Sequence, residues 1–161
     1  MNDTQLFAFE DDFVASLRCI PMAVRLKLDR SGVKLTLRQW SRFTLEDRKL
    51  LLETACRTRQ EVGDYRAELV RLVAMRSGEE ARPLAEPPPV WEAVDAVPPV
   101  VSDYALSIGL APPQPRQWAA LSDLQRFALL KLTRDNHDNV NFLPAMREFG
   151  LVAGSDPNPM G

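Results

Sequence analysis

Residues 38–52 read RQWSRFTLEDRKLLL, and a similar pattern, RQWAALSDLQRFALL, returns 78 residues later over 116–130. In each copy a Trp precedes a hydroxyl residue, and an acid or an amide stands three positions after that hydroxyl. This is the spacing of a capping box, in which both side chains satisfy free N–H groups at the start of a helix. We therefore predict that Thr44 and Ser122 are the N-caps of two apolar helices.

The two copies predict two pseudo-repeated units, near 32–57 and 109–133, each made of a short helix followed by a longer one. We expect Trp40 and Trp118 to be buried in a core that both units share. A chance similarity between two capped helices is the alternative. A tandem DNA-reading helix-turn-helix is disfavoured, because the second copy is not basic and its turn is rich in proline.

The strongest helical pattern lies near 59–76, where apolar residues recur at spacings of three and four. Thr58 and Glu61 have the form of a further capping box, and Gly78 is the expected end of the helix. Gly63 inside this segment costs about 1 kcal/mol relative to Ala. The period and both end signals agree, so this segment supports a helical fold most strongly.

Three further segments, together with the second of the two capped helices, also have a helical pattern. Pro21 fits the first turn of one helix, where its missing N–H is harmless, although residues 24–28 also alternate like a strand. Asn141 is the expected N-cap of the last helix. The four segments lie near residues 13–20, 21–32, 122–133 and 141–149.

Nine of the 13 prolines lie between residues 83 and 115, a density that favours extended segments or very short helices. The same stretch carries many apolar residues, so we expect a packed connector rather than a disordered linker. Residues 153–161 are expected to form a flexible tail. The predicted fold is thus all-α, a compact helical bundle that forms a single domain over 1–152.

The composition excludes several classes of protein. A chain of 161 residues has the usual size of one domain, and 20 Lys and Arg against 22 Asp and Glu exclude a polybasic nucleic-acid binder. No apolar run is long enough to span a membrane. Residues 1–5 lack the basic and apolar regions of a secretory signal, so a cytoplasmic location is expected. The oligomeric state is left open.

Residues suited to catalysis or metal binding are sparse. The chain has one His and two Cys, and it contains no common motif for redox chemistry, zinc hydrolysis, nucleotide binding or serine acyl transfer. We therefore predict no catalytic residue, no metal, no cofactor and no enzymatic activity. Cys19, Cys56 and His137 are retained as a weak thiol or metal site, although both cysteines are expected to be small buried residues. His137 belongs to a polar loop that lacks the Gly and Glu of an EF-hand.

Positive charge gathers near the beginning of the chain. Residues 18–49 contain nine Lys or Arg and three acids, and a local excess of this kind attracts an acidic partner. An ordinary solvated helical face is the alternative. The residues that we expect to contact a partner are Arg18, Arg25, Lys27, Arg38 and Arg42.

Residues 9–22, FEDDFVASLRCIPM, resemble the opening of the nitrate reductase-associated protein family. The close of the chain is also similar to that family, in LQRFAL over 124–129, NFLPA over 141–145 and EFGL over 148–151. The resemblance covers roughly residues 7–152.

This resemblance implies a small non-catalytic accessory protein that an active assimilatory nitrate reductase needs. The implied partner is the catalytic subunit of nitrate reductase, which carries a molybdenum–pterin cofactor. The resemblance transfers no catalytic or binding residue to this chain. Two alternatives stay open: a metal- or cofactor-transfer protein using Cys19, Cys56 and His137, and a small cytosolic regulatory module.

Overall fold

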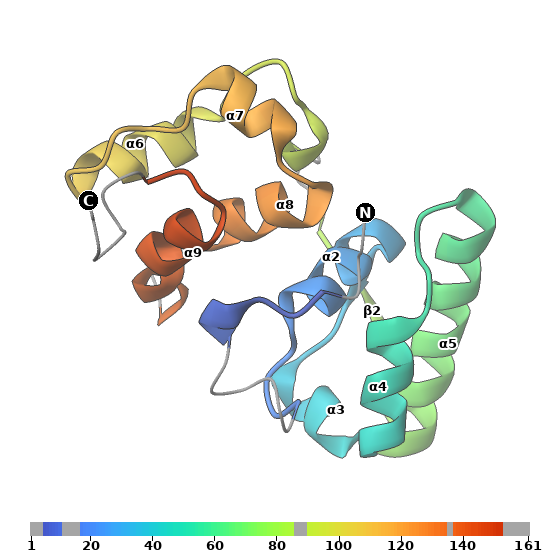
Figure 1. Cartoon of the computed structure of the whole chain (residues 1–161). Coiled ribbons are helices and arrows are strands. Elements are labelled where there is room, and N and C mark those ends of the chain that lie inside the picture. The colour runs from blue at the N-terminus through green and yellow to red at the C-terminus, as the bar shows by residue number, and fades with distance from the viewer. Residues whose placement is uncertain (1–4, 11–16, 86–89, 135–136, 153–161) are drawn as a thin grey trace. The chain divides into compact units, whose positions relative to one another are not determined.

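The computed structural model describes residues 5–10, 17–85, 90–134 and 137–152 (Figure 1). These residues are mostly helical, as predicted, and they also form one small two-stranded sheet that the all-α prediction did not include. The chain divides into two compact units, Met1–Pro88 and Pro89–Gly161. The single domain over 1–152 stays a prediction, and the predicted tail over 153–161 lies outside the described residues. No described helix combines the length and apolar character that a bilayer crossing requires.

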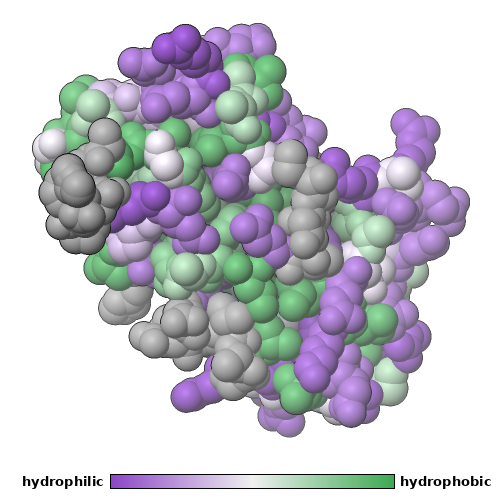
Figure 2. Space-filling view, viewed as in Figure 1, coloured by the Kyte–Doolittle hydropathy of each residue, from purple (hydrophilic) through white to green (hydrophobic). Residues whose placement is uncertain are grey.

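The first unit is built on four described α-helices. Helix α2 (Met22–Ser31) contacts both α4 (Leu45–Glu53) and α5 (Arg59–Ser77), and α3 (Leu37–Arg42) contacts α5. Helices α4 and α5 lie side by side and antiparallel (Figure 1), and hydrophilic residues predominate along α5 on the face shown in Figure 2. The elements of this unit are η1 (Ala8–Glu10), α2 (Met22–Ser31), β1 (Val33–Lys34), α3 (Leu37–Arg42), α4 (Leu45–Glu53), α5 (Arg59–Ser77) and β2 (Arg82–Pro83).

Helix α5 confirms the prediction for 59–76. The Thr58 hydroxyl accepts from the backbone N–H of Glu61, and the Glu61 carboxylate accepts from the backbone N–H of Thr58. Gly78 ends the helix with a φ of 71°, a left-handed conformation that a residue without Cβ adopts without strain. One face of α5 is buried in the core of the first unit, including Tyr65 and Leu69.

The segment before α2 differs from the prediction of a helix near 13–20. Residues 13–16 lie outside the described part of the chain, and residues 17–20 are not helical. Leu17 has a φ of 52°, which interrupts a right-handed helix. Pro21 is the N-cap of α2 rather than part of its first turn, and Gly32 ends that helix, so residues 24–28 are helical and not a strand.

Trp40 and Arg48 both donate hydrogen bonds to the carbonyl of Leu17. They correspond to Trp118 and Arg126 in the second copy of the sequence pattern. The Trp40 indole N–H donates to Leu17 O at 2.8 Å, and Arg48 Nη1 donates to the same oxygen at 3.3 Å. Arg48 Nε also donates to Trp40 O at 3.3 Å. Trp40 is fully buried, so this pair joins the segment before α2 to the α3–α4 turn.

The second unit packs around α8 (Asp123–Lys131), which contacts η2 (Val90–Glu92), α6 (Pro99–Ser107) and α9 (Phe142–Glu148). Helices α8 and α9 confirm the segments predicted near 122–133 and 141–149. Asn141 occupies the N-cap position of α9, but its side chain makes no capping hydrogen bond, because the chain enters from a 3-10 turn at φ −93° and ψ 1° instead of an extended conformation. The elements are η2 (Val90–Glu92), α6 (Pro99–Ser107), α7 (Pro115–Ala120), α8 (Asp123–Lys131), η3 (His137–Asn141) and α9 (Phe142–Glu148).

The proline-rich stretch contains a full helix, which corrects the prediction of extended or very short elements over 83–115. Helix α6 is nine residues long, the same length as α4 and α8. Pro98 is its N-cap and Pro99 its first residue, positions where a missing N–H breaks no helical hydrogen bond. Trp91 and Val101 are buried, so the stretch is packed as expected.

The turn between α7 and α8 repeats the hydrogen bonds of the turn between α3 and α4. The Trp118 indole N–H donates to Ala93 O at 2.9 Å, and Arg126 Nε donates to Trp91 O at 2.7 Å. Arg126 Nη1 donates to Trp118 O at 3.3 Å, as Arg48 does to the carbonyl of its own Trp. In both turns, therefore, a Trp and an Arg eight residues later fix a segment that precedes them in the chain.

Candidate functional site

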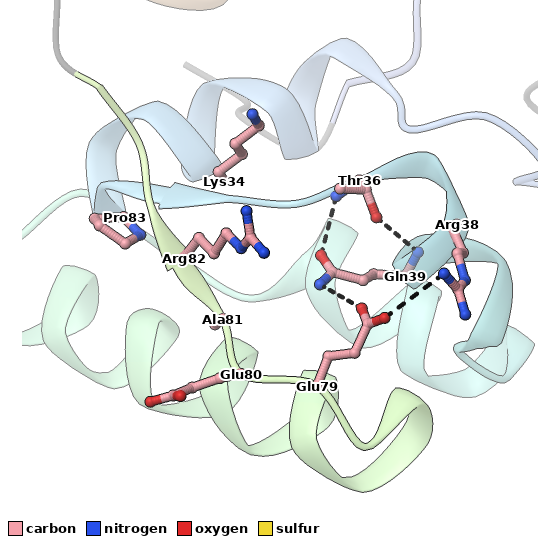
Figure 3. A pocket seen from close by; sticks show the side chains of 9 residues that line it. All are labelled: Lys34, Thr36, Arg38, Gln39, Glu79, Glu80, Ala81, Arg82 and Pro83. Carbon is pink, nitrogen blue, oxygen red and sulfur yellow. Dashed lines mark hydrogen bonds and ion pairs between the residues drawn. The ribbon is translucent and has the colours of Figure 1, made fainter.

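A groove of about 770 Å³ opens on the first unit where the sheet meets the start of α3 and the segment that follows α5 (Figure 3). Its floor and walls combine charged and polar side chains. The groove is lined by Lys34, Thr36, Arg38, Gln39, Glu79, Glu80, Ala81, Arg82 and Pro83.

The sheet places two exposed cations directly opposite each other at this groove. Strands β1 and β2 are antiparallel, and Lys34 is the register partner of Arg82. The adjacent pair is Val33 with Pro83, and the backbone N–H of Leu84 extends the ladder by donating to a carbonyl of the turn before β1 at 2.9 Å. Val33 is buried whereas Lys34 and Arg82 are exposed.

A hydrogen-bonded network fixes the other end of the groove. Thr36 and Gln39 form the capping box of α3, in which the backbone N–H of Thr36 donates to Gln39 Oε1 at 3.1 Å. The amide nitrogen of the same Gln39, a residue only 5% exposed, donates to Glu79 Oε1 at 3.0 Å. The second oxygen of Glu79 lies 3.8 Å from Arg38 Nη1. One buried amide therefore links the start of α3 to the segment after α5.

An ion pair between α4 and α5 fixes the end of α5, just before the segment that carries Glu79. Arg76 Nε donates to Asp47 Oδ2 at 2.8 Å, and Asp47 also completes the capping box of Thr44. Burial acts to raise the pKa of Asp47, but the hydrogen bond from Arg76 and those from Thr44 outweigh it, so the pKa lies below its ordinary value. The charged carboxylate thus holds the end of α5, three residues before Glu79, against the start of α4.

The cations that the sequence pointed to have three different environments. Arg18 and Arg42 are exposed, and Arg38 is exposed at the rim of the groove. Arg25 is half-buried on α2. Only Arg38 lines the groove, so the structure does not gather the predicted set into one place.

Lys27 is not at a surface, which corrects its inclusion among the partner contacts. Its side chain is fully buried, and Nζ donates to Leu52 O at 2.6 Å and to Thr54 O at 2.7 Å. These carbonyls belong to the C-terminal end of α4, where a positive charge satisfies free acceptors and complements the helix dipole. Lys27 therefore stabilises the fold and is not available to a partner.

The two cysteines lie in different environments. Cys56 is buried as expected, with Sγ 3.8 Å from the carbonyl of Lys27, whereas Cys19 is exposed, contrary to expectation, because residues 17–20 are not helical. Burial, followed by the nearby Cys56 thiol, raises the pKa of Tyr65 well above its ordinary value, and the Tyr65 hydroxyl donates to Leu51 O at 2.6 Å. The hydrogen bond of Tyr65 thus links α5 to α4.

The weak thiol or metal site predicted from Cys19, Cys56 and His137 stays a prediction, because the side chain of His137 lies outside the described residues. Within those residues, no three His, Cys, Asp or Glu side chains come together in a way that would hold a metal ion. His137 begins η3, and its side chain is outside what the structure describes.

Sequence reasoning missed Lys34, Glu79 and Arg82, three of the charged residues that line the groove. The strands that carry two of them are two residues long, and so short an element has no periodicity to detect. The available signal was indirect: each strand follows closely on a glycine that ends a helix, Gly32 before β1 and Gly78 before β2.

Comparison with known proteins assigns the chain to a family. A model of the conserved nitrate reductase-associated protein family matches residues 6–149, which is most of the chain. Neither a curated protein nor a solved structure matches this sequence.

Proposed function

Because the chain belongs to the conserved nitrate reductase-associated protein family, we propose that it is a non-catalytic accessory protein that binds the catalytic subunit of nitrate reductase. In this proposal it supports the assembly, cofactor loading or stability of that enzyme in nitrate assimilation, in the cytoplasm. The match over residues 6–149 carries the proposal, since the family description names an association with an enzyme and not an activity of its own.

The exposed cations of the first unit support a docking role. Arg18, Arg38 and Arg42 have exposed side chains, and Arg contributes strongly to protein interfaces because its planar guanidinium binds carboxylates with two hydrogen bonds. Exposed charges of one sign also accelerate encounter with a partner of the opposite sign. We propose that these residues face an acidic surface of the reductase.

The experiment that tests the function compares cells with and without this protein. We expect nitrate reductase activity to fall in cells that lack it, and the amount and molybdenum content of the reductase polypeptide to show why. Polypeptide present without molybdenum would indicate cofactor loading, and loss of the polypeptide would indicate stabilisation. Unchanged activity, with unchanged polypeptide and molybdenum, would contradict the proposal.

We also propose that the α3–α4 and α7–α8 segments are pseudo-repeats of one helical unit within a single domain. Both begin their longer helix with a capping box, at Thr44 and at Ser122. In both, the indole of a buried Trp donates to a preceding carbonyl, and an Arg eight residues later donates to the carbonyl of that Trp. Two capped helices that resembled each other by chance would not need to share these tertiary hydrogen bonds.

A further inference from the structure

The opposed cations of the sheet lower the stability of the isolated chain. Like charges directly across an antiparallel pair repel each other, and Lys34 and Arg82 occupy such positions with exposed side chains. Within the described residues, neither side chain has a hydrogen bond or an ion pair. Any anion that binds between them would remove this repulsion.

The carboxylates near the groove do not neutralise that pair. Glu79 is bound by the Gln39 amide at 3.0 Å and lies 3.8 Å from Arg38. In Figure 3 the side chain of Glu80 extends away from Lys34, whereas the Arg82 guanidinium lies over the groove toward Gln39. The open volume is therefore bordered by unpaired positive charge on the side of the sheet.

We propose that this groove binds an acidic, extended segment of a partner protein, with carboxylates placed between Lys34 and Arg82. Alternate side chains of an extended segment lie on one face, about 6.5 Å apart. Two carboxylates on that face can therefore bind the two opposed cations. A guanidinium donates two parallel hydrogen bonds to a carboxylate, which favours Arg82 as the primary contact.

The acids of the groove favour a peptide over a nucleic acid. A nucleic acid presents a phosphate at every nucleotide, and such a continuous chain of charge would pass the carboxylates of Glu79 and Glu80 on the opposite wall. A peptide can place neutral residues there and carboxylates at the sheet. The proposal rests on the proposed function, in that it names the chemistry by which the chain would recognise its partner.

The variant Lys34→Glu separates this proposal from a merely solvated pair. It replaces the repulsion with a cross-strand ion pair to Arg82, so the melting temperature should rise or stay unchanged. Binding of a fluorescent peptide of alternating Glu and Ser should weaken roughly tenfold at low salt, because an attraction becomes a repulsion. Arg82→Gln, which removes one cation without adding an acid, should weaken binding by roughly threefold.

Arg59→Glu is the matched control. Arg59 is exposed in the first turn of α5 and lies outside the groove, so its reversal changes the net charge equally and should leave peptide affinity nearly unchanged. Equal loss in Arg59→Glu and Lys34→Glu would overturn the proposal, because only net charge would then matter. Absence of peptide binding to the unaltered chain, or tighter binding of a single-stranded oligonucleotide, would overturn it too.

Purified nitrate reductase distinguishes this proposal from the broader one. If the reductase binds the unaltered chain and Arg59→Glu but binds Lys34→Glu weakly, the groove is the docking site. If all three bind equally, the groove proposal is wrong while the accessory function stands. If none binds, the proposed function fails, and the peptide titration still decides what the groove recognises.

Discussion

Replacing Arg126 with Met should destabilise the second unit severely. Arg126 is 4% exposed, and its guanidinium donates to the carbonyls of Trp91, Trp118 and Leu121 and to the carboxylate of Asp123. Met keeps the length of the stem but removes all of the hydrogen bonds that the guanidinium donates from this buried position. Breaking such a buried charged network costs about 3–5 kcal/mol.

The corresponding change in the first unit, Arg48→Met, should cost much less. Arg48 is half-buried, its bonds to the carbonyls of Leu17 and Trp40 are both 3.3 Å long, and the Trp40 indole continues to donate to Leu17. Water can replace the lost bonds, so the expected cost is about 0.5–1.5 kcal/mol. The costs of the two variants should thus differ by about 1.5 kcal/mol or more, although both arginines belong to the same pattern of hydrogen bonds.

Urea unfolding followed by circular dichroism measures both costs as differences in the free energy of unfolding. Arg147→Met is the control, because Arg147 is exposed on α9 and its replacement removes the same charge. A free energy of unfolding for Arg126→Met within about 0.5 kcal/mol of that of the unaltered chain would refute the prediction that the buried guanidinium stabilises the second unit. An Arg48→Met cost equal to that of Arg126→Met would refute the comparison between the two turns.

Three further predictions concern the first unit. Asp47→Asn should lower the free energy of unfolding by about 1–2 kcal/mol at neutral pH. Because the folded pKa of Asp47 is lowered, the difference in stability between the two chains should shrink as pH falls below about 4 and through the folded pKa. Urea unfolding at several pH values checks this. Gly63→Ala should stabilise the chain by about 0.5–1 kcal/mol in the same assay, since a Cβ there meets no atom within 4 Å and the residue is helical; a lower stability would contradict the open space. Cys19 should react with a thiol reagent in the folded chain, and Cys56 only after unfolding. Equal reaction rates for Cys19→Ser, which keeps only Cys56, and Cys56→Ser, which keeps only Cys19, would contradict this difference in exposure.

Local signals in the sequence predicted the helices well, and tertiary contacts explain where they failed. Helix α5 was predicted at both ends because its caps are hydrogen bonds between residues three positions apart. Helix α6 was missed because the density of prolines suggested short elements, whereas Pro98 and Pro99 stand at its start, where proline is tolerated.

The candidate site was harder to predict, because its geometry depends on residues far apart in the chain. A net excess of positive charge pointed to the unit that carries the groove, but charge alone did not separate exposed Arg38 from buried Lys27. The burial of Lys27 follows from the free carbonyls at the end of α4, which lie 25 or more positions later in the sequence. The pairing of Lys34 with Arg82 depends on the register of a two-stranded sheet, and the sequence pattern did not predict that sheet.

Direct binding of the purified chain to purified nitrate reductase tests the central claim most directly. Titration calorimetry should detect a saturable complex at about 30 mM salt, and the affinity should fall at about 300 mM salt because exposed charges are screened over a shorter distance. Absence of any complex at the lower salt concentration would contradict an accessory role that acts through binding to the reductase.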